Sequence, residues 1–109
     1  MNFSPYKISE KFLLQKLNSI NSGELFLENY NGKSHNFGNQ ESILKANIKI
    51  HNPKFYFNII RGGSNALAES YIKNDFRTSD LPSLIELIAK NIKVTYEFSG
   101  VLNTSSFSN

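Results

Sequence analysis

The clearest pattern in this chain is a strict alternation of apolar and polar residues over positions 44–50. Successive side chains of a β-strand point to opposite sides of the sheet, so the two kinds of residue separate onto two faces. The apolar face would hold Leu44, Ala46, Ile48 and Ile50, and the polar face Lys45, Asn47 and Lys49. The pattern therefore predicts a half-buried strand with one face in water.

Two other stretches repeat apolar residues with the period of a helix. The first begins at Ser4 and Pro5, a capping residue followed by a first-position proline, and should run to about Asn18. The second begins at Asp80 and should end near Asn91. The buried stripes would be Leu13, Leu17 and Ile20 in the first helix, and Leu81, Leu84, Ile85 and Ile88 in the second.

Residues 52–78 connect the strand to the last helix and contain a pair of glycines. Asn52 and Pro53 are typical of a helix start, whereas Gly62 and Gly63 accept the positive φ that a helix stop needs. We therefore expect one short helix before the glycines, a second over residues 66–73, and a brief extended piece at residues 76–78.

A hairpin is predicted over residues 23–38, because two short runs with apolar residues flank Asn31 and Gly32. An Asn-Gly pair favours the two-residue type I′ turn. Residues 94–98 alternate again and resemble an edge strand. Together the elements predict one α+β domain over residues 1–92, followed by a tail or the start of a linker over residues 93–109.

Composition and charge exclude several classes of protein. The 109 residues include no cysteine, which excludes disulfides and thiolate metal sites. No apolar run approaches the roughly 20 residues of a membrane span, and no signal-peptide core is present, so a cytoplasmic location is expected. The formal net charge is +3, and it is concentrated in residues 1–62. Such an imbalance either keeps the surface soluble or attracts anionic lipid headgroups.

No catalytic, cofactor or metal site is predicted from the residues themselves. His35 and His51 are the only histidines, and no carboxylates have the spacing of metal ligands beside them. Gly62 and Gly63 follow a helix, whereas a dinucleotide-binding glycine loop follows a strand. The aromatic run at residues 55–57 has no RNA-binding signature around it, so no nucleic-acid partner is expected.

Residues 12–92 contain an ordered series of short motifs: GELFL at 23–27, FG at 37–38, ANIKI at 46–50, NPKFY at 52–56, RGG at 61–63, ALAESY at 66–71, Phe76, DLPSL at 80–84 and KN at 90–91. This series resembles the N-terminal domain of cyclopropane-fatty-acyl-phospholipid synthases, the mycolic acid cyclopropane synthase-like methyltransferases. The chain departs from the family pattern at Asn52, where aspartate is usual, at Ala66 and Ala68, which replace glycines, and at Phe76, where tryptophan is common.

The resemblance implies a sterol-carrier-protein-2-like fold: a curved, mainly antiparallel sheet covered by short helices, with an apolar cavity between them. The cavity would take a phospholipid or a fatty acyl chain. The lipid-facing residues would be Ile48, Ile50, Phe55, Ile59, Leu67 and Tyr71. Lys45 and Lys49, on the wet face of the strand, would contact the membrane surface weakly.

The implied role is that of an accessory lipid-binding domain serving a methyltransferase that uses S-adenosylmethionine. The glycine-rich cofactor loop and catalytic residues of that enzyme have no counterpart in these 109 residues, so this chain alone is not expected to be an enzyme. The expected partners are a catalytic methyltransferase domain and a second copy of the chain, with a location peripheral to the inner membrane face. Two alternatives remain open: a standalone lipid carrier of the same fold, and a structural or dimerisation module that binds no lipid.

Overall fold

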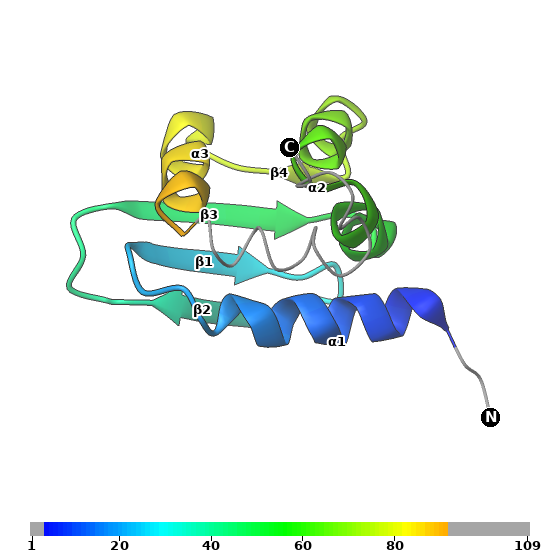
Figure 1. The fold of residues 1–109 in the computed structure, drawn as a ribbon, viewed down its shortest axis with the longest axis horizontal. Helices are drawn as coiled ribbons and strands as arrows, with labels where there is room; N and C mark the ends of the chain where they lie inside the picture. The colour runs from blue at the N-terminus through cyan, green and yellow to red at the C-terminus, as the bar shows by residue number, and fades with distance from the viewer. Residues whose placement is uncertain (1–3, 92–109) are drawn as a thin grey trace, which may run out of the picture.

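The computed structural model describes residues 4–91, which form three helices and a four-stranded mixed sheet (Figure 1). In chain order the elements are α1 (Pro5–Leu17), β1 (Glu24–Glu28), β2 (Ser34–Gly38), β3 (Lys45–Ile50), α2 (Lys54–Ile72), β4 (Phe76–Arg77) and α3 (Leu81–Lys90). The α+β class predicted from the sequence is confirmed. The strand expected at residues 94–98 and the tail at residues 93–109 lie outside the described residues.

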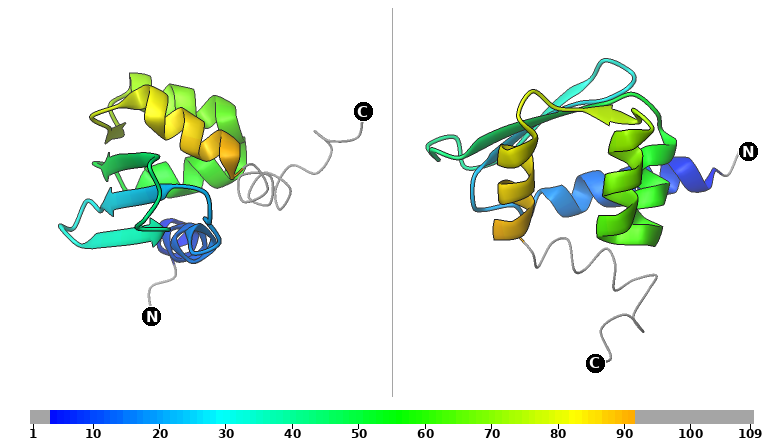
Figure 2. Two further views of the ribbon diagram at one scale, coloured as in Figure 1. Left: turned by 90° about the vertical axis from the view of Figure 1, so that its left-hand side faces the viewer. Right: turned by 90° about the horizontal axis from the view of Figure 1, so that it is seen from above.

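The sheet has the strand order β2-β1-β3-β4 and is mixed. β1 pairs antiparallel with β2, and β3 pairs antiparallel with β4, but the two central strands β1 and β3 run parallel. The expected mainly antiparallel sheet therefore holds only for the two outer pairs. All three helices lie on one face of the sheet and leave its other face uncovered (Figure 2).

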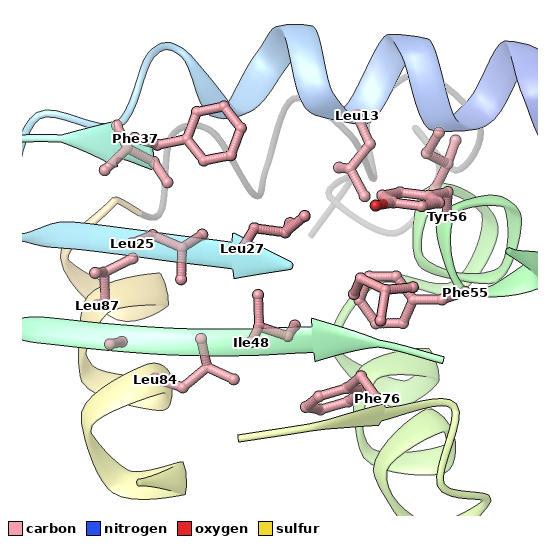
Figure 3. Packing of buried hydrophobic residues seen from close by; sticks show 14 residues of the cluster. Leu13, Leu25, Leu27, Phe37, Ile48, Phe55, Tyr56, Phe76, Leu84 and Leu87 are labelled. Atoms are coloured by element: carbon pink, nitrogen blue, oxygen red, sulfur yellow. The ribbon is translucent and has the colours of Figure 1, made fainter. Parts of the chain in front are cut away.

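The core lies between the helices and the covered face of the sheet (Figure 3). Ala46, Ile48 and Ile50 of β3 are buried there, while Lys45 and Lys49 are exposed on the other face. The predicted alternation of β3 is thereby confirmed. The adjacent strand β1 turns Leu25 and Leu27 to the same core, because its register with β3 places equivalent faces together (Figure 3).

The β1–β2 hairpin closes through a longer loop than the predicted two-residue turn. The amide N–H of Asn29 donates to the carbonyl of Lys33 at 2.7 Å, so three residues stand between the paired ends. Gly32 has φ +87°, whereas Asn31 does not take the positive φ that a type I′ turn requires. The type I′ prediction is wrong, and the Asn29 side chain gives the reason: it is buried and anchors the loop to the core.

Helix α2 consists of two helical segments that meet at Gly63, so the predicted break at Gly62 and Gly63 is confirmed. Gly63 has φ 59° and ψ −134° in the middle of the helix, a conformation that glycine adopts without steric cost. The second segment starts directly after Gly63, slightly before the predicted residue 66. At the other end the Asn52 side-chain oxygen accepts from the N–H of Lys54 at 3.0 Å, and the helix begins one residue later than predicted.

The starts of α1 and α3 follow the sequence signals. Ser4 Oγ accepts from the amide of Lys7, and Pro5 takes the first helical position. The Asp80 carboxylate accepts from both the amide and the hydroxyl of Ser83, at 3.1 and 2.8 Å, and these hydrogen bonds hold the pKa of Asp80 below its usual value.

The buried stripe of α3 differs from the prediction at two positions, because it includes Leu87 and excludes Ile85. Leu84 and Leu87 are fully buried, whereas Ile85 is 47% exposed. Leu84, Leu87 and Asn91 recur at i, i+3 and i+7, and this row is the one that meets the sheet. Ile85 lies about 100° around the helix from Leu84, and its assignment to the buried stripe is wrong.

Candidate ligand-binding site

An apolar hollow of about 100 Å³ lies between the covered face of the sheet and the three helices. Its lining is contributed by every layer of the fold: Leu25, Leu27 and Ile48 from the sheet, Leu13 and Leu17 from α1, Phe55, Ile59 and Leu67 from α2, and Leu84, Leu87 and Ile88 from α3. Figure 3 shows several of these side chains pointing toward one another from the sheet and the helices. We call this space the apolar hollow.

Four of the six predicted lipid-facing residues line the apolar hollow, namely Ile48, Phe55, Ile59 and Leu67. Ile50 and Tyr71 are not among its lining residues. Ile50 is completely buried at the far end of β3, paired with Phe76. Tyr71 is 40% exposed and packs its ring against Phe76, with the ring centroids 5.6 Å apart.

The lining residues that the sequence prediction missed come from α1, β1 and α3. Leu25 and Leu27 alternate in the motif GELFL, so a signal for their shared face was present in the sequence. Nothing in the sequence indicated which strand would lie beside β3, and their place in the hollow depends on the parallel β1–β3 pairing.

The polar groups around the apolar hollow are few and already satisfied. Asn91 Oδ1 accepts from the amides of Asn21 and Ser22, and its Nδ2 donates to the carbonyls of Ser22 and Leu87. Ser64 is exposed, so its hydroxyl stands at the outer margin. None of the described lining residues is ionisable, so the hollow suits an uncharged apolar group and penalises a buried carboxylate or ammonium.

The volume limits what the hollow encloses as it stands. An engineered apolar cavity of roughly 150 Å³ accepts benzene, and pockets for drug-sized ligands span roughly 300–1,000 Å³. At about 100 Å³ the apolar hollow encloses part of one acyl chain but no complete phospholipid. A longer chain would have to extend out of the hollow or displace a helix.

A separate polar network ties α1, the β1–β2 loop and α2 together. The Tyr56 hydroxyl donates to Asn29 Oδ1 at 2.6 Å, and Asn29 Nδ2 donates to Glu10 Oε2 at 2.8 Å. The Tyr30 hydroxyl donates to the other oxygen of the Glu10 carboxylate at 2.6 Å. This last bond, together with burial, raises the pKa of Tyr30 to about 12, and burial raises the pKa of Tyr56. Both tyrosines therefore stay neutral near pH 7 and act as hydrogen-bond donors.

The two lysines predicted to face a membrane each have a glutamate partner on the uncovered face of the sheet. Lys45 Nζ lies 2.6 Å from Glu24 Oε1, and Lys49 Nζ lies 3.9 Å from Glu28 Oε2. The Lys45 ammonium, with a hydrogen bond from Asn36, holds the pKa of Glu24 below its usual value. Membrane contact through Lys45 and Lys49 stays a prediction, but their positive charge is locally balanced.

Within residues 4–91, no group of three histidine or carboxylate side chains is placed to hold a metal ion. His35 stacks on Phe37, with ring centroids 5.9 Å apart, and His51 Nδ1 lies 3.2 Å from the carbonyl of Asn74. Among the described helices, none has the length and apolar character needed to cross a bilayer.

The chain matches no protein-family model, no curated protein and no solved structure. The resemblance to the cyclopropane synthase N-terminal domain therefore rests on the ordered sequence motifs alone. The family and its lipid-related role stay predictions.

Proposed function

We propose that this domain binds one acyl chain of a lipid in the apolar hollow. The observation that carries the proposal is the lining: side chains from the sheet and all three helices converge on one space, and no described ionisable group faces it. An acyl chain gains free energy by leaving water for such a surface, at roughly 25 cal/mol per Å² buried. A polar headgroup would remain outside, beyond Ser64 at the margin.

The wider role follows the resemblance: an accessory lipid-binding domain of a methyltransferase that acts on phospholipid acyl chains with S-adenosylmethionine. In this proposal the domain holds or presents the chain, and a catalytic domain carries out methyl transfer. A sheet with helices on one face and an apolar space between the layers supports the sterol-carrier-protein-2-like form of the proposal. A standalone carrier would use the same hollow in the same way.

A second candidate is a structural module that binds no lipid, and the size of the hollow favours it. A space of about 100 Å³ is smaller than the roughly 150 Å³ cavity that accepts benzene, and every described buried side-chain polar atom has a hydrogen-bond partner. The two candidates differ in whether a ligand enters the apolar hollow.

The deciding experiment is a fluorescence titration of the purified chain with a naturally fluorescent polyene fatty acid, followed by competition with saturated acids of increasing length. The proposal expects saturable binding at one site and displacement that improves with chain length. Absence of saturable binding, or displacement that is independent of chain length, would leave the structural module as the function of this domain.

A further inference from the structure

The lysines among residues 4–91 differ in whether a carboxylate lies beside them. Three of them lie within 4.0 Å of a glutamate oxygen: Lys45 with Glu24, Lys49 with Glu28, and Lys90 with Glu86. Exposed lysines with no carboxylate within that distance among residues 4–91 are Lys7, Lys11, Lys33, Lys54 and Lys73. Of these, Lys7, Lys11 and Lys54 lie on α1 and α2, away from the sheet face on which the sequence placed its membrane-facing lysines.

The first turn of α1 and the first half of α2 meet at one end of the molecule (Figure 1). The ring of Tyr6 packs edge-on against Phe57, with centroids 5.4 Å apart. The Arg61 guanidinium lies over the same Phe57 ring at 5.3 Å from its centroid. These contacts join the two helices into one surface that carries both cations and aromatic rings.

Neither helix places a free carboxylate beside these cations. Lys54, Phe57 and Arg61 recur at i, i+3 and i+7, so they share one face of α2, and no acidic residue occurs between positions 54 and 68. On α1 the acidic residue is Glu10, whose carboxylate accepts hydrogen bonds from the loop side chains of Asn29 and Tyr30.

Exposed apolar side chains lie beside the lysines of α1. Ile8, between Lys7 and Lys11, is 47% exposed, and Tyr6 is also exposed. We call this surface the basic corner, and define it by Tyr6, Lys7, Ile8, Lys11, Lys54 and Arg61.

We propose that the basic corner is the surface through which this domain docks on an anionic bilayer. The proposal rests on the proposed function, because it gives the route by which the domain reaches its acyl chain. The ammonium and guanidinium groups of lysine and arginine interact with anionic lipid headgroups, and exposed tyrosine and isoleucine side chains enter the interfacial region of the bilayer. Nucleic acid fits less well, since four cations spread over two helices are sparse and Phe57 is already covered by Tyr6 and Arg61.

The test compares two triple variants that change the total charge equally. The corner variant carries Lys7→Gln, Lys11→Gln and Lys54→Gln, and the control variant carries Lys45→Gln, Lys49→Gln and Lys90→Gln. Each lowers the formal net charge from +3 to 0. Sedimentation measures binding to phosphatidylcholine vesicles with and without phosphatidylglycerol, at low and high salt, and circular dichroism checks that each variant is folded.

The wild-type chain should bind the anionic vesicles at low salt, with binding weakened by high salt and by neutral lipid. The corner variant should lose on the order of 100-fold in binding, whereas the control variant should keep most of it. Equal losses in the two variants would overturn the proposal, and so would equal binding of wild type to anionic and neutral vesicles. Tighter binding of a single-stranded oligonucleotide, lost in the corner variant alone, would reassign the surface to nucleic acid.

The fatty-acid titration separates this inference from the proposed function. Binding of free fatty acid should be the same in the corner variant and in wild type, because none of the three substituted lysines lines the apolar hollow. Vesicle binding that depends on the corner without any fatty-acid binding would support the docking surface and refute the lipid-binding role of the hollow.

Discussion

Leu67→Phe is expected to fill part of the apolar hollow, and its effects on stability and on ligand binding should have opposite signs. Leu67 is half-buried on α2 just after the kink and lines the hollow. Empty apolar space costs roughly 24 cal/mol per Å³, so a volume of about 100 Å³ corresponds to an upper limit of about 2.4 kcal/mol. One ring occupies only part of the space and meets some steric resistance, so the free energy of unfolding should rise by roughly 1 kcal/mol.

The assay is urea denaturation followed by circular dichroism, combined with the fatty-acid titration on the same protein. Leu67→Phe should raise the urea midpoint and weaken fatty-acid binding at least tenfold, since the ring occupies the ligand's space. Ile72→Phe is the matched control, because it enlarges an aliphatic residue on the same helix at a position that is 82% exposed. It should change neither quantity. Loss of stability in Leu67→Phe with unchanged affinity would refute the reasoning and show that side chains already fill the hollow.

Two further predictions concern the polar groups that hold the helices in place. Asn91→Leu should lower the free energy of unfolding by roughly 2–4 kcal/mol, because it leaves the amides of Asn21 and Ser22 and the Ser22 carbonyl without their partner. The control Asn65→Leu, at an exposed helix position, should change it by less than about 0.5 kcal/mol. Equal urea midpoints for the two variants would contradict this prediction. The pKa of Tyr30 is raised in the folded state from its ordinary 10 to about 12, so the folded chain holds this proton more tightly and stability should fall as pH rises from about 10 through 12. Tyr30→Phe should flatten that fall in urea midpoints measured from pH 8 to 12. An unchanged slope would rule out the Tyr30–Glu10 hydrogen bond as the cause of the fall.

The features that the sequence predicted correctly are those set by neighbouring residues. Ser4 accepts from the amide of Lys7 and Asp80 from the amide of Ser83, and each hydrogen bond fixes a helix start over a span of three residues. The alternation of β3 fixes which of its side chains are buried, because the period of two is a property of the strand itself.

The features that were missed depend on contacts between distant residues. The mixed sheet follows from the parallel pairing of β1 with β3, and the same register places Glu24 opposite Lys45 and Glu28 opposite Lys49. The sequence did not reveal this register, so Lys45 and Lys49 were predicted to be positive charges without a carboxylate partner. The candidate site shows the same limit: the family resemblance implied Ile48 and Phe55, whereas Leu25 lies beside them only because of the sheet order.

Polar and apolar side chains around the hollow differ in how completely they are packed, and the proposed acyl-chain site depends on this difference. Every described buried side-chain polar atom has a partner, and at the margin Asn91 uses both its oxygen and its nitrogen. The apolar side chains beside it leave space whose cost, up to about 2.4 kcal/mol, is a large share of the 5–15 kcal/mol that stabilises a typical domain. A ligand that enters this space recovers that free energy, and a single leucine-to-phenylalanine change would recover part of it without a ligand. If the hollow is the proposed acyl-chain site, Leu67→Phe exchanges ligand affinity for stability, and opposite effects on the two quantities would test that proposal directly.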